Sequence, residues 1–382
     1  MSKIPAAICL LSLLLGGVSC RSDHRIVDRA SASRAPNILL IVADDLGYGD
    51  CSAYPHHAPD VHTPAIDQLA AGGALFTSGY VSAPACSPSR TGLISGRYQE
   101  RFDKAAGWHT TLPRAATTIA EHLRADGYAT LMLGKNDFGH PLADKLDDRR
   151  YPLNHGYDHH LGFEAHAHDY FLLTAGIERR TKDAHEDSAN VGPLDCDLGT
   201  KDFPGGYTTE IFTDAAIDFA KQNRARPFFI ALAYNAVHDL VEQVPPQYLQ
   251  RRGLKAIPLF NPDSGQSYKA YYNTYNNYRV INETEMRQFY LANLDCLNDN
   301  IARLLRALDR MHLSNNTLVV FLSDNGGSPN AGGNHQPLRG AKYGTFEGGI
   351  RIPFMMRWPG HIAPRQIIDD PVISLDLLAT FA

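Results

Sequence analysis

The sequence has no concentrated run of basic residues. Its 382 residues carry 36 Lys and Arg against 41 Asp and Glu, which gives a formal net charge of −5. Proteins that bind nucleic acids neutralise phosphates with clustered Lys and Arg. We therefore expect no nucleic-acid partner.

Cysteine is also scarce, and no two cysteines have the Cys-x-x-Cys spacing of structural zinc sites. Two of the six cysteines, Cys9 and Cys20, belong to an N-terminal segment. Four lie in the body of the chain: Cys51, Cys86, Cys196 and Cys296. In an oxidising compartment such residues can form disulfides, but the sequence fixes no pairing.

The apolar run over residues 8–15 is too short for a membrane span, which needs about 20 residues. It follows Lys3 and ends in small residues before Cys20, the pattern of an export signal. We expect a signal peptide over residues 1–20, a polar linker over 21–35, and a periplasmic, outer-surface or extracellular protein. Cys20 resembles a bacterial lipoprotein box, although Gly17 stands where Leu is usual, so lipid anchoring and plain cleavage both stay open.

Buried-type strands alternate with amphipathic helices along the rest of the chain, which is 44% hydrophobic overall. Continuous apolar runs predict strands at residues 37–43, 128–133, 227–234 and 317–322. Helical periodicity and end signals predict helices at residues 64–72, 116–127, 208–223 and 283–311. This alternation predicts an α/β fold with a mainly parallel central sheet flanked by helices, in one large domain over residues 36–382.

Two stretches interrupt the alternation. Residues 140–207 are rich in His, Asp and Gly, and residues 245–282 are rich in Tyr and Asn. Long irregular insertions of this kind are usually binding loops or lids. The tyrosines suit stacking on sugar rings, while a solvated surface loop is the plainer interpretation.

The predicted strands end in polar residues, and the carboxyl ends of parallel strands are where open α/β sheets bind ligands. The residues at or near these ends are Asp44, Asp45, Lys135, His238, Asp324 and Asn325. The Asp and Asn side chains offer only oxygen ligands, which suit Ca²⁺ or Mg²⁺ rather than Zn²⁺. A single Asp after a strand is usually a turn or cap residue, but two such pairs favour a metal site.

Residues 86–98 read CSPSRTGLISGRY. Ser87 can cap a helix, and Pro88 suits its first turn. Cys86 is then expected at a helix N-terminus, which favours anions, and Arg90 projects over the same turn. A lone cysteine in such a place is otherwise a small buried apolar residue.

This string resembles the C-x-P-S-R signature of the type I sulfatases, in which the cysteine is oxidised to formylglycine. The resemblance continues in order along residues 36–382. Asp44-Asp45 and Asp324-Asn325 resemble the two metal-binding pairs of the family, and the segments around His238 and Lys342 resemble its substrate-binding segments.

The resemblance implies an alkaline-phosphatase-like α/β fold and hydrolysis of sulfate esters. It implies one Ca²⁺, with Mg²⁺ less favoured, held by Asp44, Asp45, the modified Cys86, Asp324 and Asn325. It implies the catalytic residues Cys86, Arg90, Lys135, His238 and Lys342. A formylglycine-generating enzyme is an implied partner, and a sulfated carbohydrate or aryl sulfate the implied substrate.

The family mechanism uses the two hydroxyls of hydrated formylglycine at position 86. One hydroxyl attacks sulfur and displaces the alcohol, and the other loses its proton as the adduct collapses and expels sulfate. Arg90, Lys135 and Lys342 supply positive charge for the sulfuryl oxygens. His238 is expected to protonate the leaving alcohol, and Asp324 to accept the proton of the nucleophile.

The chain departs from the family pattern in two places. The usual Gly-Lys-x-His reads Gly134-Lys135-Asn136-Asp137, so Asp137 stands at the position of the His, and His140 is the nearby candidate to replace it. The chain also ends at residue 382 without the small C-terminal antiparallel subdomain that members usually have. We therefore expect that this subdomain is missing.

Two other functions stay open. A phosphodiesterase or phosphonate hydrolase of the same superfamily has similar metal and Lys residues, but Cys86 favours a sulfatase because the phosphatase relatives usually have Ser or Thr there. A non-catalytic protein that binds sulfated glycans is the second alternative, and it predicts that Cys86 stays unmodified.

Overall fold

The computed structural model describes residues 35–102, 112–113, 115–138, 151–164, 166–172, 189–190, 192–197, 199–268, 270–274 and 282–382. The predicted signal peptide, nearly all of the predicted linker, and His140 lie outside these residues. Within them, no helix combines the length and the hydropathy that a membrane crossing requires.

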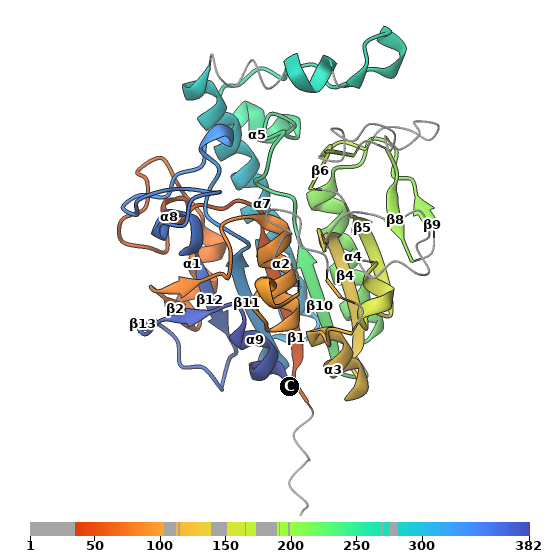
Figure 1. Ribbon diagram of the computed structural model, residues 1–382, viewed down its shortest axis with the longest axis vertical. Coiled ribbons are helices and arrows are strands. Elements are labelled where there is room, and N and C mark those ends of the chain that lie inside the picture. Colours follow the sequence, from red (N-terminus) through yellow and green to blue (C-terminus); the bar gives the residue numbers. More distant parts are fainter. Residues whose placement is uncertain are drawn as a thin grey trace, which may run out of the picture. The chain divides into compact units, whose positions relative to one another are not determined.

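A ten-stranded sheet runs through the domain (Figure 1). Its strands lie in the order β13 (Gln366–Ile368), β2 (Ala74–Phe76), β12 (Phe354–Arg357), β11 (Thr317–Ser323), β1 (Asn37–Ala43), β10 (Phe228–Ala233), β4 (Ala129–Lys135), β5 (His159–Phe163), β8 (Leu194–Cys196) and β9 (Gly199–Lys201). The strands from β11 to β5 are parallel, and antiparallel pairs extend the sheet on both sides. Two short parallel pairs are separate from it: β14 (Val372–Ile373) with β3 (Gly79–Tyr80), and β6 (Ala167–His168) with β7 (Ala189–Asn190).

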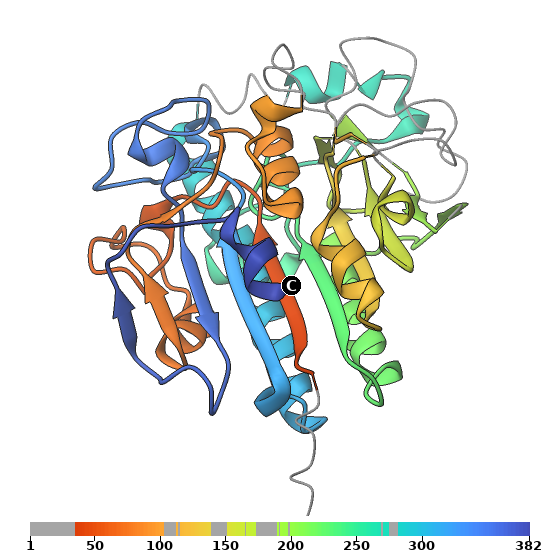
Figure 2. The same ribbon diagram turned by 60° about the horizontal axis from the view of Figure 1, so that its bottom comes forward.

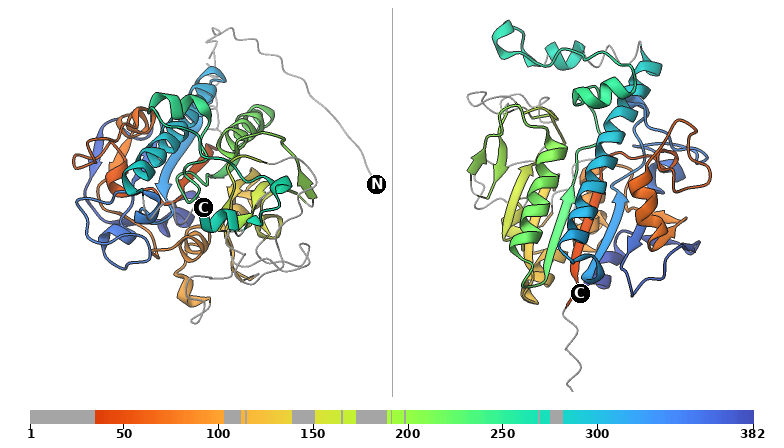
Figure 3. Two further views of the ribbon diagram at one scale, coloured as in Figure 1. Left: turned by 90° about the horizontal axis from the view of Figure 1, so that it is seen from above. Right: turned by 180° about the vertical axis from the view of Figure 1, so that it is seen from behind.

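Helices cover both faces of the sheet, so the central strands are buried on both sides. One face packs on α1 (Pro64–Ala71), α4 (Thr208–Gln222), α5 (Pro246–Arg251) and α7 (Glu283–Arg310) (Figure 3). The other packs on α2 (Cys86–Ser95), α3 (Ile119–Ala125) and α9 (Asp376–Phe381) (Figure 2). Alternate residues of β1 enter the two cores, because successive side chains of a strand point to opposite faces. The fold is therefore the predicted α/β class.

The register of the central strands brings distant residues to one edge. Ala43 of β1 pairs with Ser323 of β11, so the residues that follow each strand leave the sheet side by side. Ala233 of β10 pairs in the same way with Gly134 of β4. Gly134 has φ +84°, and a Cβ atom there would lie 1.9 Å from the carbonyl oxygen of Ala233, so this crossing requires glycine.

The predicted strands and helices are present with shifts of a few residues at their ends. Three predictions were wrong. Residues 140–207 contain β5, which extends the parallel sheet, together with the short strands β6 to β9. Residues 245–282, also predicted to be irregular, contain α5 and a helical stretch over residues 270–274. Ser87 does not cap α2: the helix begins at Cys86, and Ala85 is its N-cap.

Candidate active site

Four polar side chains form an acidic floor at the carboxyl ends of β1 and β11: Asp44, Asp45, Asp324 and Asn325. All four are fully buried. The backbone N–H of Asp45 donates to Asp324 Oδ1 at 3.1 Å, and Asn325 Nδ2 donates to Asp45 Oδ1 at 2.7 Å. These two hydrogen bonds join residues that are 279 and 280 positions apart in the sequence. The polar residues that follow β1 and β11 are therefore in direct contact.

Three cations pair with this floor: Lys135 at the end of β4, Lys342, and Arg90 of α2. Lys135 Nζ lies 2.8 Å from Asp44 Oδ2, and Lys342 Nζ lies 2.7 Å from Asp45 Oδ2. Arg90 Nε lies 2.8 Å from Asp324 Oδ2, and its Nη1 donates to the carbonyl of Lys135 at 2.7 Å. The side chains of all three are buried. We call these residues the cationic ring.

Cys86 opens α2 directly above the acidic floor. Its Sγ lies 3.6 Å from Asp44 Oδ1 and 3.9 Å from Asp45 Oδ1. Burial raises the pKa of the Cys86 thiol well above its usual value, although Lys135 and Lys342 oppose the shift. The unmodified side chain is therefore a neutral thiol, which is a poor nucleophile.

The carboxylates of the floor respond differently to burial. Burial raises the pKa of Asp44 well above its usual value, and Lys135 offsets this only in part. Burial also raises the pKa of Asp45 against the effect of Lys342. For Asp324, the nearby Arg90 and the two lysines outweigh burial and lower the pKa. The floor thus gathers three buried carboxylates, and each of them pairs with one cation of the ring.

This floor fits a hard divalent cation. Ligand atoms of Asp44, Asp45, Cys86 and His238 lie within 4.8 Å of one another. Asn325 Oδ1 is buried and has no hydrogen-bond partner among the described residues. Oxygen donors that crowd together in this way suit Ca²⁺ or Mg²⁺. The sequence did not predict that His238 would join this group, which it does with Nε2 at 3.6 Å from Asp45 Oδ2.

His238 lies in a buried and positively charged place. Burial, with Lys342 and Lys135 nearby, lowers the pKa of His238 well below its usual value. The ring is therefore neutral at pH 7, whereas the sequence suggested a group that titrates near neutrality. A neutral imidazole has one N–H, which can donate a hydrogen bond to a group in the cavity.

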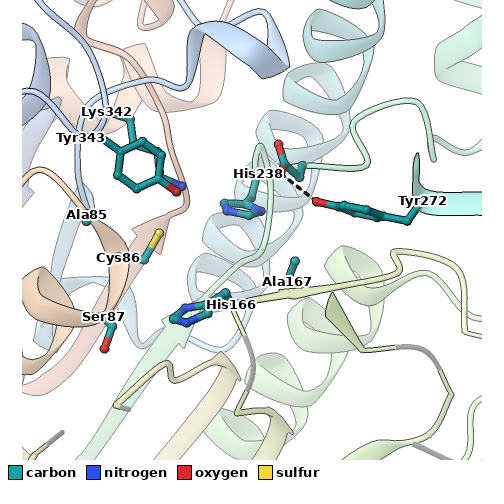
Figure 4. Close-up of a pocket in the computed structure, with 10 residues that line it drawn as sticks. Ala85, Cys86, Ser87, His166, Ala167, His238, Tyr272, Lys342 and Tyr343 are labelled. Carbon is teal, nitrogen blue, oxygen red and sulfur yellow. Dashed lines mark hydrogen bonds between the residues drawn. The ribbon is translucent and has the colours of Figure 1, made fainter. Parts of the chain in front are cut away.

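A cavity of about 480 Å³ opens above Cys86 (Figure 4). Three predicted site residues line it: Cys86, His238 and Lys342. The other polar and aromatic side chains in its lining were not predicted from the sequence: Ser87, His166, Asp239, Tyr272 and Tyr343. Tyr272 comes from the Tyr-rich insertion, and its hydroxyl donates to Asp239 Oδ2 at 3.3 Å. We call His166, Tyr272 and Tyr343 the outer wall.

The structure thus brings the predicted catalytic and metal-binding residues to one place, whereas the candidate His140 lies outside the described residues. The sequence indicated Tyr272 only as one of several tyrosines in the Tyr-rich residues 245–282. His166 had no signal of its own, because several other histidines surround it in residues 155–168.

A family model described as Sulfatase matches residues 36–382. The chain is 31% identical over 386 residues to an arylsulfatase of Hemicentrotus pulcherrimus, with 98% of this chain and 61% of that protein covered. It is 30% identical to the N-acetylgalactosamine-6-sulfatase of Homo sapiens, over 92% of this chain and 62% of the relative. The chain therefore spans about three fifths of the length of these curated relatives.

Solved structures share the fold. The structure of Ps i-CgsB in complex with k-i-k-neocarrahexaose has a TM-score of 0.72 and 29% identity, covering 91% of this chain and 71% of that one. A phosphonate monoester hydrolase of Agrobacterium radiobacter has a TM-score of 0.59 at 19% identity, a likeness of fold alone. Since the family model covers nearly the whole chain and the relatives agree with it, this protein belongs to the sulfatase family.

Proposed function

We propose that this protein hydrolyses sulfate esters with a formylglycine made from Cys86 and one bound Ca²⁺, and that its substrate is a sulfated carbohydrate. The observation that carries the proposal is the placement of Cys86. The side chain stands at a helix N-terminus, between the acidic floor and the cavity, within 3.6 Å of Asp44 Oδ1.

The sulfur of Cys86 stands in for the hydroxyl oxygens of the hydrated aldehyde. When present, that group supplies a nucleophile together with a second hydroxyl for release of the product, and a cation on the floor supplies Lewis acidity. Asp44, Asp45, Asp324 and Asn325 are proposed to hold the cation together with the modified residue 86. A buried thiol whose pKa is raised offers no equivalent reactivity.

The chain's own residues provide the electrostatics. Lys342 lines the cavity beside Cys86, and Lys135 and Arg90 lie beneath it, so positive charge surrounds the place where a sulfuryl group would develop negative charge. His238 also lines the cavity and is proposed to donate a hydrogen bond to the leaving oxygen. Asp324 is ionised and is proposed to accept a proton from the nucleophile.

A carbohydrate substrate is supported by the cavity and by the relatives. Tyr272 and Tyr343 offer aromatic faces at its edge, and faces of this kind suit sugar rings. Ps i-CgsB was solved in complex with k-i-k-neocarrahexaose, and the curated relative from Homo sapiens is named N-acetylgalactosamine-6-sulfatase. We also propose export through residues 1–20, anchoring or cleavage at Cys20, and maturation by a formylglycine-generating enzyme.

Two measurements on protein from a host that matures sulfatases test the proposal. Mass spectrometry of the peptide with Cys86 is expected to show an aldehyde or its hydrate, and recovery of free thiol alone would contradict it. Kinetics on matched 4-nitrophenyl sulfate and phosphate esters are expected to favour sulfate. A strong phosphate preference would instead establish the phosphoesterase alternative, and sulfated-glycan binding without turnover would establish the binding-protein alternative.

A further inference from the structure

Asn136 has a buried side-chain amide beside the cationic ring. The residue directly follows β4, next to Lys135, and is 1% exposed. Its backbone N–H donates to the carbonyl of Phe163 at 3.2 Å, which fixes the main chain. Neither Oδ1 nor Nδ2 of its side chain has a hydrogen-bond partner among the described residues. A buried amide without a partner is unfavourable, so a partner other than these residues is expected.

The other buried asparagines of the described residues differ from Asn136 in this respect. Each of the six makes at least one side-chain hydrogen bond: Asn37, Asn235, Asn293, Asn298, Asn300 and Asn325. Asn37, at the opposite end of β1 from the acidic floor, donates through Nδ2 to Thr317 Oγ1 at 3.3 Å. The amide of Asn136 is therefore an exception within this part of the chain.

A small cavity beside Asn136 has room for the missing partner. This inner cavity measures about 20 Å³ and shares no lining residue with the cavity above Cys86. Its polar lining residues are Arg90, Lys135 and Asn136, and apolar residues of β1, α2, β4 and β10 make most of the rest. A cavity needs about 10–15 Å³ to hold one water molecule. The inner cavity therefore fits a single water molecule.

The guanidinium of Arg90 offers a second polar contact to such a molecule. Its Nη1 donates to the carbonyl of Lys135, the residue before Asn136, at 2.7 Å. Its Nη2 lies 3.4 Å from Asp44 Oδ1 and makes no hydrogen bond with the described residues. A guanidinium only donates, whereas the Oδ1 atom of an asparagine only accepts. A water molecule does both, so one molecule can accept from Nη2 and donate to Oδ1 of Asn136.

We propose that the inner cavity binds one water molecule that links the Asn136 amide to Arg90 Nη2, and that Asn136 is a positioning residue for Arg90. The Nε atom of Arg90 already donates to Asp324 Oδ2 at 2.8 Å. With the water, all three nitrogens of the guanidinium have hydrogen-bond partners, and the cation keeps one orientation. A cation fixed in advance stabilises developing charge without reorganising. The inference rests on the proposed sulfatase activity, in which Arg90 supplies positive charge.

The first test is a high-resolution crystal structure of the full chain. The wild type is expected to show one density peak within hydrogen-bond distance of both the Asn136 side chain and Arg90 Nη2. Asn136→Leu is expected to show none, because apolar cavities stay dry. A wild-type map with other buried waters but no peak in the inner cavity would overturn the water site. A peak that contacts Asn136 but not Arg90 would overturn the positioning role.

The second test is kinetic and uses the matured, calcium-loaded protein with 4-nitrophenyl sulfate. Asn136→Leu is close in volume but apolar, and it is expected to lower kcat by about tenfold with KM changed far less, because Arg90 keeps its other contacts. Asn136→Ser keeps a hydroxyl for the water and is expected to hold kcat within about threefold of the wild type. Asn37→Leu removes an equally buried amide far from the site and is the matched control, with kcat unchanged.

Two kinetic outcomes would contradict the inference. One is a folded Asn136→Leu variant with kcat within about twofold of the wild type. The other is an Asn136→Ser variant as slow as Asn136→Leu, since packing rather than hydrogen bonding would then explain the loss. If the wild type carries formylglycine and Ca²⁺ yet hydrolyses no sulfate ester, the proposed function fails instead, and the density maps still decide whether a water molecule links Asn136 to Arg90.

Discussion

The acidic floor and the outer wall of one cavity are built in different ways. Each floor residue directly follows a long central strand that is buried on both faces. Of the wall residues, His166 and Tyr343 lie outside the helices and strands, and Tyr272 lies in a short helical stretch over residues 270–274. Side chains on rigid elements hold tighter geometry than side chains on loops. We therefore expect the floor to carry the proposed reaction and the tyrosines of the wall to contact the substrate.

The largest expected effect comes from removing the proposed nucleophile at the floor. Cys86→Ala is expected to lower kcat on 4-nitrophenyl sulfate by at least about a thousandfold, because no other group lies in the same position. Its melting temperature is expected to change little, since the substitution removes one atom. Cys196→Ala is the control and is expected to keep full activity. Residual turnover of Cys86→Ala above a few per cent would refute the assignment.

Metal removal is expected to affect both activity and stability, because the floor gathers buried carboxylates whose repulsion a divalent cation offsets. Dialysis against EGTA is expected to abolish turnover and to lower the melting temperature, since a ligand at a hundredfold excess over Kd stabilises the fold by about 2.7 kcal/mol. Ca²⁺ is expected to restore both better than Mg²⁺. Unchanged calorimetric and kinetic traces after chelation would argue against a metal at the floor.

An ion pair between Arg287 and Asp50 joins the two loops that carry the floor residues. Arg287 of α7 binds Asp50 Oδ1 at 2.7 Å and the carbonyl of Gly332 at 2.8 Å, which ties together the loops that follow β1 and β11. Arg287→Ala leaves the buried Asp50 without this partner and is expected to cost about 3 kcal/mol of unfolding free energy. Arg251→Ala, which removes the exposed pair with Asp299, is the control and is expected to cost less than about 1 kcal/mol.

The pH dependence of that cost follows from Asp50. Burial raises the pKa of Asp50 to about 6, against the effect of Arg287. Stability from this group is full below its unfolded pKa of about 3.9 and is lost as the pH rises through 6. Without Arg287 the loss is larger, so urea unfolding is expected to show a greater penalty for Arg287→Ala at pH 8 than at pH 5. An equal penalty at both values would contradict the pairing.

The smallest effect is expected at the wall. Tyr272→Ala is expected to raise KM for a sulfated oligosaccharide by about tenfold or less, as the loss of one aromatic contact does, and to leave 4-nitrophenyl sulfate kinetics unchanged. Tyr98→Ala, an exposed tyrosine outside the cavity, is the control. If both substrates lost turnover equally, Tyr272 would serve the reaction and the separation of floor from wall would fail.

The same contrast explains what the sequence revealed. Central strands such as β1 are continuous apolar runs, so they and the polar residues that end them were predicted from the sequence. β5 reads HHLGF and has an exposed first residue, so it carries no comparable pattern. β5 is a strand because it pairs with β4, and this long-range pairing leaves no periodic pattern in the sequence of β5 itself. His166 was missed for the same reason, because its partner Asp137 is 29 residues away.

The register of β1 and β11 has a consequence for folding. The two halves of the acidic floor lie far apart along the chain, and the contact between Asn325 and Asp45 spans 280 residues. Closing so long a loop is slow and entropically unfavourable, so these contacts form only when the central strands are paired. A cation that contacts residues of both halves would therefore bind tightly only after the central strands have paired. Its binding would be a late step of folding.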